Sequence, residues 1–393
     1  MVGVIYESCT PDSKNFINIQ MGQMVPIEGA DTCRVRTGYE RVLAHRTRMP
    51  FAYVAEQDGV ILEHDTKNKL IKIKYKDGKL VAVKYGEQYT ANPGAGFVVT
   101  QRIVFNSKIK GKRISKHDVI CYNQDFFAPD PFSSQVDAKL GVNGKVALVE
   151  SATTMEDGCV VGKRISKLLV SKPVQVREVV IKKSTIVHKF ADVGTEVLSA
   201  TPLLIFDDSI IPDEYQQDAD MLDTIKRLNR RTPKAKYTGK VVKIEAFYKD
   251  TTKDMSDSLR KLVTHVSKSA NTDAKFAKGT VNEQKFWPTV GIAGDRVGQV
   301  DFDTDTVVLR FSVQQTLDCN GGDKVVFGGA LKSVCAKVDE NPITTEDGKI
   351  EVDALMSATS VHNRMVVSTL IVGATTRILE TMEQEILNLY FND

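Results

Sequence analysis

Short runs that alternate apolar and polar residues dominate the chain as far as Val170. The clearest are 59–62, 70–75 and 80–85, and Asp-Gly or Gly separates several of these runs from the next. A period of two places every second side chain on one face of a strand, where it can be buried. The pattern from Val35 to Val170 therefore predicts β-hairpins.

Strand patterns continue beyond Val170, and helical spacing joins them. Further strands are predicted at 176–181, 185–187, 203–206 and 240–247. A helix is predicted between Asp254 and Ser269, with an apolar face made of Leu259, Leu262, Val263 and Val266. The stretch 212–228 is acidic at first and basic afterwards, which predicts a surface segment.

The end of the chain, from Arg364 to Asp393, carries large apolar side chains at helical spacing. These side chains are Leu370, Ile371, Ile378, Leu379, Met382, Ile386 and Leu389. We expect a mostly β body followed by a terminal helix that opens near Arg364.

Composition limits the number of domains and the class of protein. The 393 residues are 42% apolar and 26% charged, enough for two or three domains with a sizeable core. Lys and Arg number 53 against 50 Asp and Glu, so the net charge of +3 does not by itself indicate nucleic-acid binding.

Other features bear on the compartment of the protein. No apolar run approaches the roughly 20 residues that a membrane span needs, and Glu7, Asp12 and Lys14 interrupt the N-terminus where a signal peptide is apolar. The six cysteines lie at least 16 residues apart, without a Cys-x-x-Cys pair. We therefore expect a protein that is neither membrane-spanning nor exported, with reduced thiols.

The most pointed candidate site is a glycine-rich stretch between two lysines. Gly322, Asp323 and Lys324 are followed eight residues later by Lys332, with Gly328 between them. Glycines let backbone approach phosphates closely, and the lysines supply point charges. A hairpin with two solvated lysines is the structural alternative.

Two acidic groups offer candidate metal or ribose contacts. Glu156 and Asp157 lie between two apolar strands and can hold a hydrated metal or a ribose hydroxyl, although Met-Glu-Asp-Gly is also ordinary turn chemistry. Asp301, Asp303 and Asp305 resemble a three-aspartate magnesium loop, but Thr304 occupies the place where such a loop wants glycine. We interpret that second group as an acidic surface turn.

Three basic clusters have the charge to follow a phosphate backbone, although charge runs are more often solvated surfaces. They lie at 108–116, at 163–172 and at 226–236, and the last two contain Lys163, Arg164, Arg230 and Arg231. Arg364 stands near the predicted start of the terminal helix, where anions bind.

Taken in order, these motifs resemble the C-terminal half of the β subunit of multisubunit, DNA-directed RNA polymerases. The matching pieces are Arg36–Arg41, Gly141–Ala147, Glu156-Asp157, Gly322-Asp-Lys324, Lys332, Asp353-Ala-Leu and Asn363-Arg-Met. The interval between Lys324 and Lys332 equals that of the family's Gly-Asp-Lys and Gly-Asn-Lys-Gly motifs. The likeness covers nearly the whole chain at low identity.

The departures from the family's pattern are also informative. The family's aromatic motif before Glu-Asp is replaced by Glu150–Met155, and Gly-Asn-Lys-Gly has become Ala330–Ser333. Such drift, together with a chain that covers only part of β, resembles the split polymerase genes of giant tailed bacteriophages. We therefore expect one subunit of a phage enzyme that transcribes DNA into RNA by nucleotidyl transfer.

The resemblance implies a mainly β fold with some α, organised around a double-psi β-barrel. It divides the chain into a hybrid-binding region with the first part of the barrel (1–168), a wall- and flap-like insertion (169–305), the second part of the barrel (306–363) and a C-terminal helix (364–393).

The resemblance also implies roles for single residues. Lys324 and Lys332 would contact the RNA 3′ end and the incoming nucleotide, and Arg364 the triphosphate. Glu156 and Asp157 would shape the surroundings of the second magnesium ion, with Asp157 an indirect contact. Further nucleic-acid contacts are expected from Arg41, Lys163, Arg164, Arg230 and Arg231.

The implied partners are a β N-terminal-like chain, β′-like chains and a promoter-specificity subunit, acting with DNA template, RNA and nucleoside triphosphates. The catalytic Mg²⁺ would be held mainly by a β′-like chain, and the complex would work in the cytoplasm of the infected host or be packaged in the virion. The alternative is a non-catalytic nucleic-acid-binding or structural virion protein that keeps the barrel.

Overall fold

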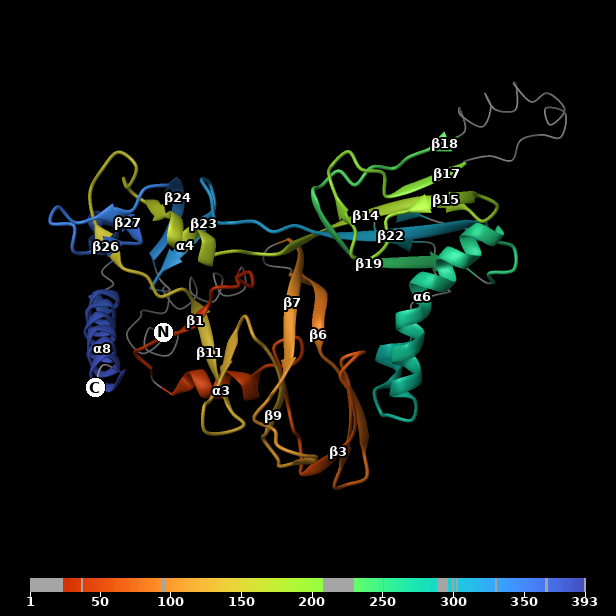
Figure 1. Cartoon of the computed structure of the whole chain (residues 1–393), viewed down its shortest axis with the longest axis horizontal. Helices are drawn as coiled ribbons and strands as arrows, with labels where there is room; N and C mark the ends of the chain where they lie inside the picture. The colour runs from red at the N-terminus through yellow and green to blue at the C-terminus, as the bar shows by residue number, and fades with distance from the viewer. Residues whose placement is uncertain are drawn as a thin grey trace. The chain divides into compact units, whose positions relative to one another are not determined.

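The computed structural model describes residues 24–36, 38–92, 96–207, 230–249, 251–287, 296–298, 300–301, 303–328, 331–364 and 367–391. Strands take up 41% of these residues and helices 21%, so the predicted mainly β fold is confirmed. Two compact units are present, and Figure 1 shows their elements along the chain. Unit 1 comprises residues 1–59, 85–172 and 316–393, and unit 2 comprises 60–84 and 173–315.

A five-stranded mixed sheet forms the part of unit 1 that carries most candidate residues. Its order is β12 (Val146–Leu148), β27 (Ala354–Met356), β13 (Gly158–Gly162), β24 (Leu331–Asp339) and β23 (Lys324–Phe327). The pairs β12–β27 and β13–β24 are parallel, whereas β13–β27 and β23–β24 are antiparallel. Segments from the two halves of the sequence are thereby joined in one sheet.

The inward side chains of this sheet form a small apolar core. Cys159, Leu331, Cys335 and Met356 are buried there, and Ile165 of α4 (Lys163–Leu168) packs against them. The cysteines in the described part of the chain are free and buried.

Antiparallel strand pairs and the helix α3 make up much of the rest of unit 1. α3 (Tyr39–Arg46) packs on a core that includes Ala44, Val119 and Val136. The pairs are β6–β7, β7–β9, β2–β9, β1–β11 and β10–β11. The strands are β1 (Asp31–Thr32), β2 (Ala52–Val54), β6 (Gly86–Asn92), β7 (Phe97–Phe105), β8 (Arg113–Ile114), β9 (Val119–Asn123), β10 (Phe127–Pro129), β11 (Val136–Gly141), β25 (Ile343–Thr344) and β26 (Glu351–Val352).

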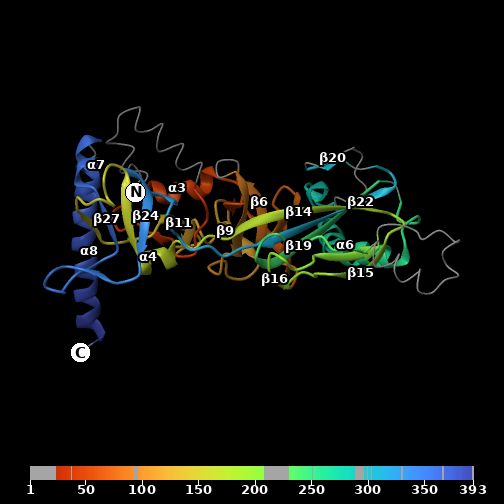
Figure 2. The ribbon, with the colours of Figure 1, turned by 90° about the horizontal axis from the view of Figure 1, so that it is seen from above.

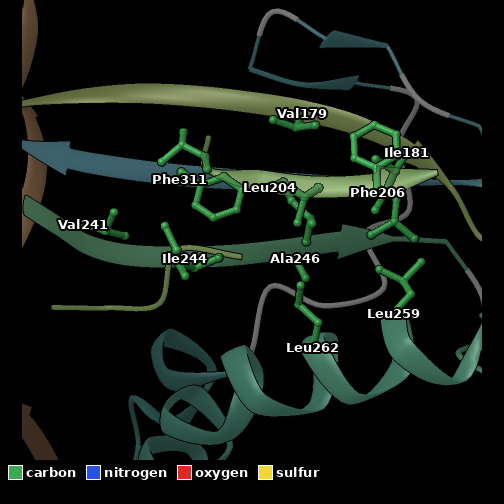
Figure 3. Close-up of a cluster of buried hydrophobic side chains, with 14 of the residues drawn as sticks. Val179, Ile181, Leu204, Phe206, Val241, Ile244, Ala246, Leu259, Leu262 and Phe311 are labelled. Atoms are coloured by element: carbon green, nitrogen blue, oxygen red, sulfur yellow. The ribbon is translucent and has the colours of Figure 1, made fainter. Parts of the chain in front are cut away.

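Unit 2 is built on the antiparallel strands β14, β22, β19 and β16. Helix α6 (Asp257–Ala277) covers one face of this sheet, and Figure 3 shows Leu259 and Leu262 directed from the helix toward Ile244 and Ala246. The predicted helix and its apolar face are confirmed. The strands of unit 2 are β14 (Pro173–Lys182), β15 (Ile186–Phe190), β16 (Glu196–Val197), β17 (Leu204–Asp207), β18 (Arg230–Arg231), β19 (Gly239–Tyr248), β20 (Arg296–Val297), β21 (Val300–Asp301) and β22 (Thr306–Gln314).

The predicted hairpins near residues 59–85 are also confirmed. They form β3 (Gly59–Asp65), β4 (Leu70–Tyr75) and β5 (Leu80–Lys84), and β4 pairs antiparallel with β5. The side chain of Asn282 bonds to the backbone of Ala82 just before the short helix η2 (Glu283–Phe286). The β4–β5 hairpin is thus tied to the segment that follows α6.

The chain ends in two helices rather than one. α7 (Ala358–Asn363) begins at Ser357, whose hydroxyl accepts a hydrogen bond from the Ser360 N–H (3.2 Å), and α8 spans Val367–Phe391. Arg364 is the C-cap of α7. The terminal helix thus begins close to Arg364, at Val367, and a separate short helix that is capped by Ser357 precedes it.

The remaining sequence predictions divide into three kinds. Asp303 and Asp305 are exposed, as is Asp301 in β21, in keeping with an acidic surface turn. The 212–228 segment lies outside the described residues. The double-psi barrel stays a prediction, because the sheets among the described residues are open, and so do the four domain ranges.

Candidate functional site

Strands β23 and β24 form the lysine hairpin, a name we use for residues 324–339. Lys324 lies opposite Val334, and Lys332 lies opposite Val326. All four side chains are exposed, whereas Leu331 on the other face is buried in the core. In an antiparallel pair such diagonal neighbours lie about 7–8 Å apart, so both lysines project from one face of the hairpin.

The turn before Lys324 is fixed by backbone hydrogen bonds. Gly322 has a φ of +93°, which favours glycine, and its N–H donates to the Cys335 carbonyl at 2.8 Å. The Asp323 carboxylate accepts from the Asn320 N–H at 2.8 Å. This geometry determines where β23 begins and therefore where Lys324 leaves the sheet.

The Glu156–Asp157 turn lies directly beside the lysine hairpin. The Val334 N–H donates to the Asp157 carbonyl at 2.8 Å. Arg364 completes the group, since its Nη2 donates to Asp157 Oδ1 at 2.5 Å and its Nη1 to the Lys332 carbonyl at 3.2 Å. Asp157, Lys332 and Arg364, which are far apart in sequence, therefore meet in one place.

The conformation of this turn is unusual for the residues that form it. Glu156 has a φ of +52°, and its carbonyl accepts a hydrogen bond from the Ser360 hydroxyl of α7. A side chain at Gly158 would place its Cβ 2.8 Å from the Thr153 carbonyl oxygen. Non-glycine residues rarely adopt positive φ, so tertiary contacts hold Glu156 and Asp157 in position.

Glu150 is a member of the site that the sequence did not indicate. Its Oε1 accepts from the Ser357 hydroxyl at 2.8 Å and from the Thr359 N–H at 2.9 Å. The backbone bond from Thr359, followed by the Ser357 hydroxyl, lowers the pKa of Glu150 below its ordinary value. No local signal reveals this contact, because Glu150 lies 207 residues before Ser357.

These groups surround a hollow of about 490 Å³. Its lining contains three carboxylates and one guanidinium, and the rest is small polar or apolar: Glu150, Met155, Glu156, Asp157, Ser357, Thr359, Ser360, Asn363 and Arg364. Three carboxylates against one guanidinium make the hollow acidic, and Arg364 links its lining to the lysine hairpin through the Lys332 carbonyl.

Arg164 has a structural contact of its own. It binds the buried carboxylate of Asp353 through Nε to Oδ1 at 2.7 Å and Nη2 to Oδ2 at 2.6 Å, and Asp353 also accepts from the Lys145 N–H. Burial opposes ionisation of Asp353, but Arg164 and the Lys145 N–H outweigh it and lower the pKa of this carboxyl. The pair fastens α4 to the segment before β27.

The other expected nucleic-acid contacts have different partners. Lys163 pairs with Glu340 at 2.8 Å, and Arg41 contacts Asp137 at 3.2 Å. Arg230 and Arg231 form β18 in unit 2, where Arg230 Nε is 3.6 Å from Asp207 Oδ1. Their predicted binding of nucleic acid stays a prediction.

The lysines differ from these residues in their surroundings. Within the described residues neither Lys324 nor Lys332 has an ion-pair partner. Their exposed ammonium groups are therefore accessible to an anionic ligand.

The carboxylates of the hollow do not form a complete metal site. In the described part of the chain, no three Asp, Glu, His or Cys side chains are arranged to hold an ion. Asp157 is instead engaged by Arg364. The residues present therefore do not fit a magnesium ion bound by this chain alone.

None of the described helices is long and apolar enough to cross a membrane.

The comparisons with other proteins give no family assignment. No protein-family model matches the chain, and no curated protein matches it either.

Proposed function

We propose that the chain is the C-terminal part of the β subunit of a multisubunit DNA-dependent RNA polymerase of phage type. The observation that carries the proposal is that Arg364 contacts both Asp157 and the backbone of Lys332, in the hairpin that also carries Lys324. The sequence resemblance named these residues from separate motifs. Their spatial convergence supports a common site.

The charges of the site suit nucleotidyl transfer. In this reaction the protein contributes mainly positioning and electrostatic stabilisation of the phosphates. Lys324 and Lys332 would bind phosphates at the RNA 3′ end and on the incoming nucleotide. Arg364, held by Asp157 and the Lys332 carbonyl, would direct its remaining N–H groups toward the triphosphate.

The remainder of the enzyme would come from other chains. A β′-like partner would hold the catalytic Mg²⁺, and a β N-terminal-like chain and a promoter-specificity subunit would complete the complex. Under this proposal the five-stranded sheet belongs to a double-psi barrel, and unit 2 corresponds largely to the wall and flap region. The complex would act in the infected host cell or be carried in the virion.

The test is RNA synthesis by the reconstituted complex with Lys324→Ala or Lys332→Ala in this chain. We expect each variant to assemble and to lose at least tenfold in nucleotide addition, because a phosphate contact is removed. Lys349→Ala, which removes an exposed lysine from the turn between β25 and β26, is the matched control and should be neutral. Full activity of both site variants would leave the non-catalytic alternative.

A further inference from the structure

Two loops of unit 1 lie side by side and form one surface. The basic loop, our name for residues 107–117, lies between β7 and β9, and the aromatic loop, residues 130–135, lies between β10 and β11. Lys108 Nζ of the basic loop donates a hydrogen bond to the Pro131 carbonyl of the aromatic loop at 2.8 Å. Figures 1 and 2 both show β9 and β11, the strands that follow these loops, close to each other and to α3.

The basic loop carries five cations and no carboxylate. Lys108, Lys110, Lys112, Arg113 and Lys116 fall within nine residues, and all except Lys108 are exposed. Among the described residues, the four exposed cations have no ion-pair partner. Their positive charge is therefore available to an anionic ligand.

The carboxylates next to the basic loop are engaged in hydrogen bonds that stabilise it. Asp118 accepts from the Ser115 N–H and from the Ser134 hydroxyl, each at 2.6 Å. Asp58 accepts from the Lys116 N–H at 2.9 Å. The five cations outnumber these carboxylates, so the surface keeps a net positive charge.

Phe132 stands exposed in the aromatic loop. Its side chain is 97% exposed, more than any other large apolar side chain that the structure describes. The carboxylate of Asp130, a buried residue, accepts from the Phe132 N–H at 3.0 Å and from the Ser133 hydroxyl at 2.8 Å. The loop therefore holds an apolar ring in water, where covering it with a ligand is favourable.

We propose that this surface binds a single strand of nucleic acid, with a base stacked on the Phe132 ring and the neighbouring phosphates paired with the exposed cations of the basic loop. Proteins that bind single strands combine cations along the phosphate backbone with aromatic rings against the bases. The inference goes beyond the proposed function, because none of these residues lines the hollow or belongs to the lysine hairpin.

The chemistry of the surface favours a single strand over a duplex or an acidic peptide. A single strand offers a negative charge and a free base face at every nucleotide, which matches a ring beside a run of cations. In a duplex the base faces are already stacked on one another. An acidic peptide would supply the charge without a planar group to cover Phe132.

The test measures binding of a fluorescein-labelled oligothymidylate of about twelve nucleotides to the whole chain, by fluorescence anisotropy at several salt concentrations. Lys110→Gln combined with Lys112→Gln should weaken binding at least fivefold at low salt. It should also reduce the slope of log K against log salt by about 1.4, because each phosphate contact contributes roughly 0.7. Lys145→Gln combined with Lys349→Gln removes two exposed lysines elsewhere in unit 1 and should change neither value.

The ring is tested separately from the charge. Phe132→Ala should weaken binding of the oligothymidylate at least fivefold and leave the salt slope unchanged, because stacking releases no counterions. Phe132→Trp should keep the affinity, since an indole also stacks on a base. Binding of a duplex of the same length should not respond to Phe132→Ala. Oligouridylate should bind within about threefold of oligothymidylate, because phosphates and base faces are common to RNA and DNA.

Several outcomes would overturn the inference once circular dichroism has shown that the variants are folded. One is unchanged affinity in the double lysine variant or in Phe132→Ala. Another is equal competition by polyglutamate of the same charge, because this would show that the surface recognises charge alone. A preference of tenfold or more for either RNA or DNA would contradict a surface that uses only phosphates and base faces.

The inference and the proposed function fail separately. Loss of RNA synthesis by the Lys324→Ala complex, together with unchanged oligothymidylate binding by Phe132→Ala, would refute the inference alone. Synthesis that survives the Lys324→Ala and Lys332→Ala substitutions, together with weakened binding by Phe132→Ala, would refute the proposed function alone.

Discussion

Arg364 is the residue on which the geometry of the site depends most. It contacts a side chain from one turn and a backbone carbonyl from another, so it joins the Glu156–Asp157 turn to the lysine hairpin. A guanidinium has donors in a fixed fork and serves both contacts at once, whereas an ammonium is a point charge.

Arg364→Lys should therefore preserve the positive charge and remove the forked pair of N–H donors that makes both contacts. We expect nucleotide addition by the assembled complex to fall at least tenfold, with little change in the stability of the chain, because Arg364 lies at the surface. Primer-extension rates and thermal unfolding measured on the same preparation check this. A lysine variant with unaltered rates would show that charge alone is sufficient.

Asp353 gives a prediction about pH. Because its pKa is lowered in the folded chain, its contribution to stability is complete above the ordinary value of 3.8 and is lost as the pH falls through the lower folded value. Asp353→Asn should cost about 1–3 kcal/mol at neutral pH. It should also flatten the loss of stability with acid below pH 3.8.

Urea unfolding at several pH values measures both effects of Asp353→Asn. Asp318→Asn is the control, because that carboxylate is exposed and makes no hydrogen bond or ion pair with the other described residues. An equally steep acid dependence in wild type and Asp353→Asn would contradict the assignment.

Among the elements, apolar periodicity predicted the strands and helices whose position depends on burial alone. The β4–β5 hairpin and the apolar face of α6 follow from local patterns, because the apolar side chains of these segments are the buried ones. β5 buries Val81, Ala82 and Val83 in succession and so both of its faces, whereas α6 buries one face. The short helix α7 was not predicted, since its start depends on the Ser357 cap rather than on apolar spacing.

Gly328 links two of these elements, the lysine hairpin and α8. Its φ is +58°, and a Cβ there would lie 2.4 Å from Thr369 Cγ2. Gly328→Ala should destabilise unit 1 by about 1–3 kcal/mol and displace either the first turn of α8 or the hairpin. Denaturant unfolding measures the loss.

Gly348→Ala separates the cost of the positive φ from the cost of the contact with Thr369. Gly348 has a φ of +68°, and a Cβ at this position would have no neighbouring atom within 4 Å, so its substitution carries the backbone cost without the clash. Gly328→Ala should therefore be the more damaging of the two. Equal losses would show that the contact with Thr369 does not matter.

At the scale of the whole molecule, the sequence named residues that meet at the candidate site, but it did not predict the long-range contacts that bring them together. The eight-residue interval between Lys324 and Lys332 and the Glu-Asp pair were visible as motifs. The strand pairing that sets Cys159 beside Cys335, and the support that Glu150 gives to α7, join segments that are distant in the sequence. Periodicity within single segments carries no information about such pairings.

The central claim is that the lysine hairpin meets the 3′ end of RNA, and photo-crosslinking tests it most directly. An RNA primer with 4-thiouridine at its 3′ end would be irradiated in the assembled complex, and the cross-linked peptide identified by mass spectrometry. We predict a cross-link within residues 324–339, weakened in the Lys324→Ala and Lys332→Ala variants. A complex that extends the primer but cross-links it only elsewhere would contradict the account.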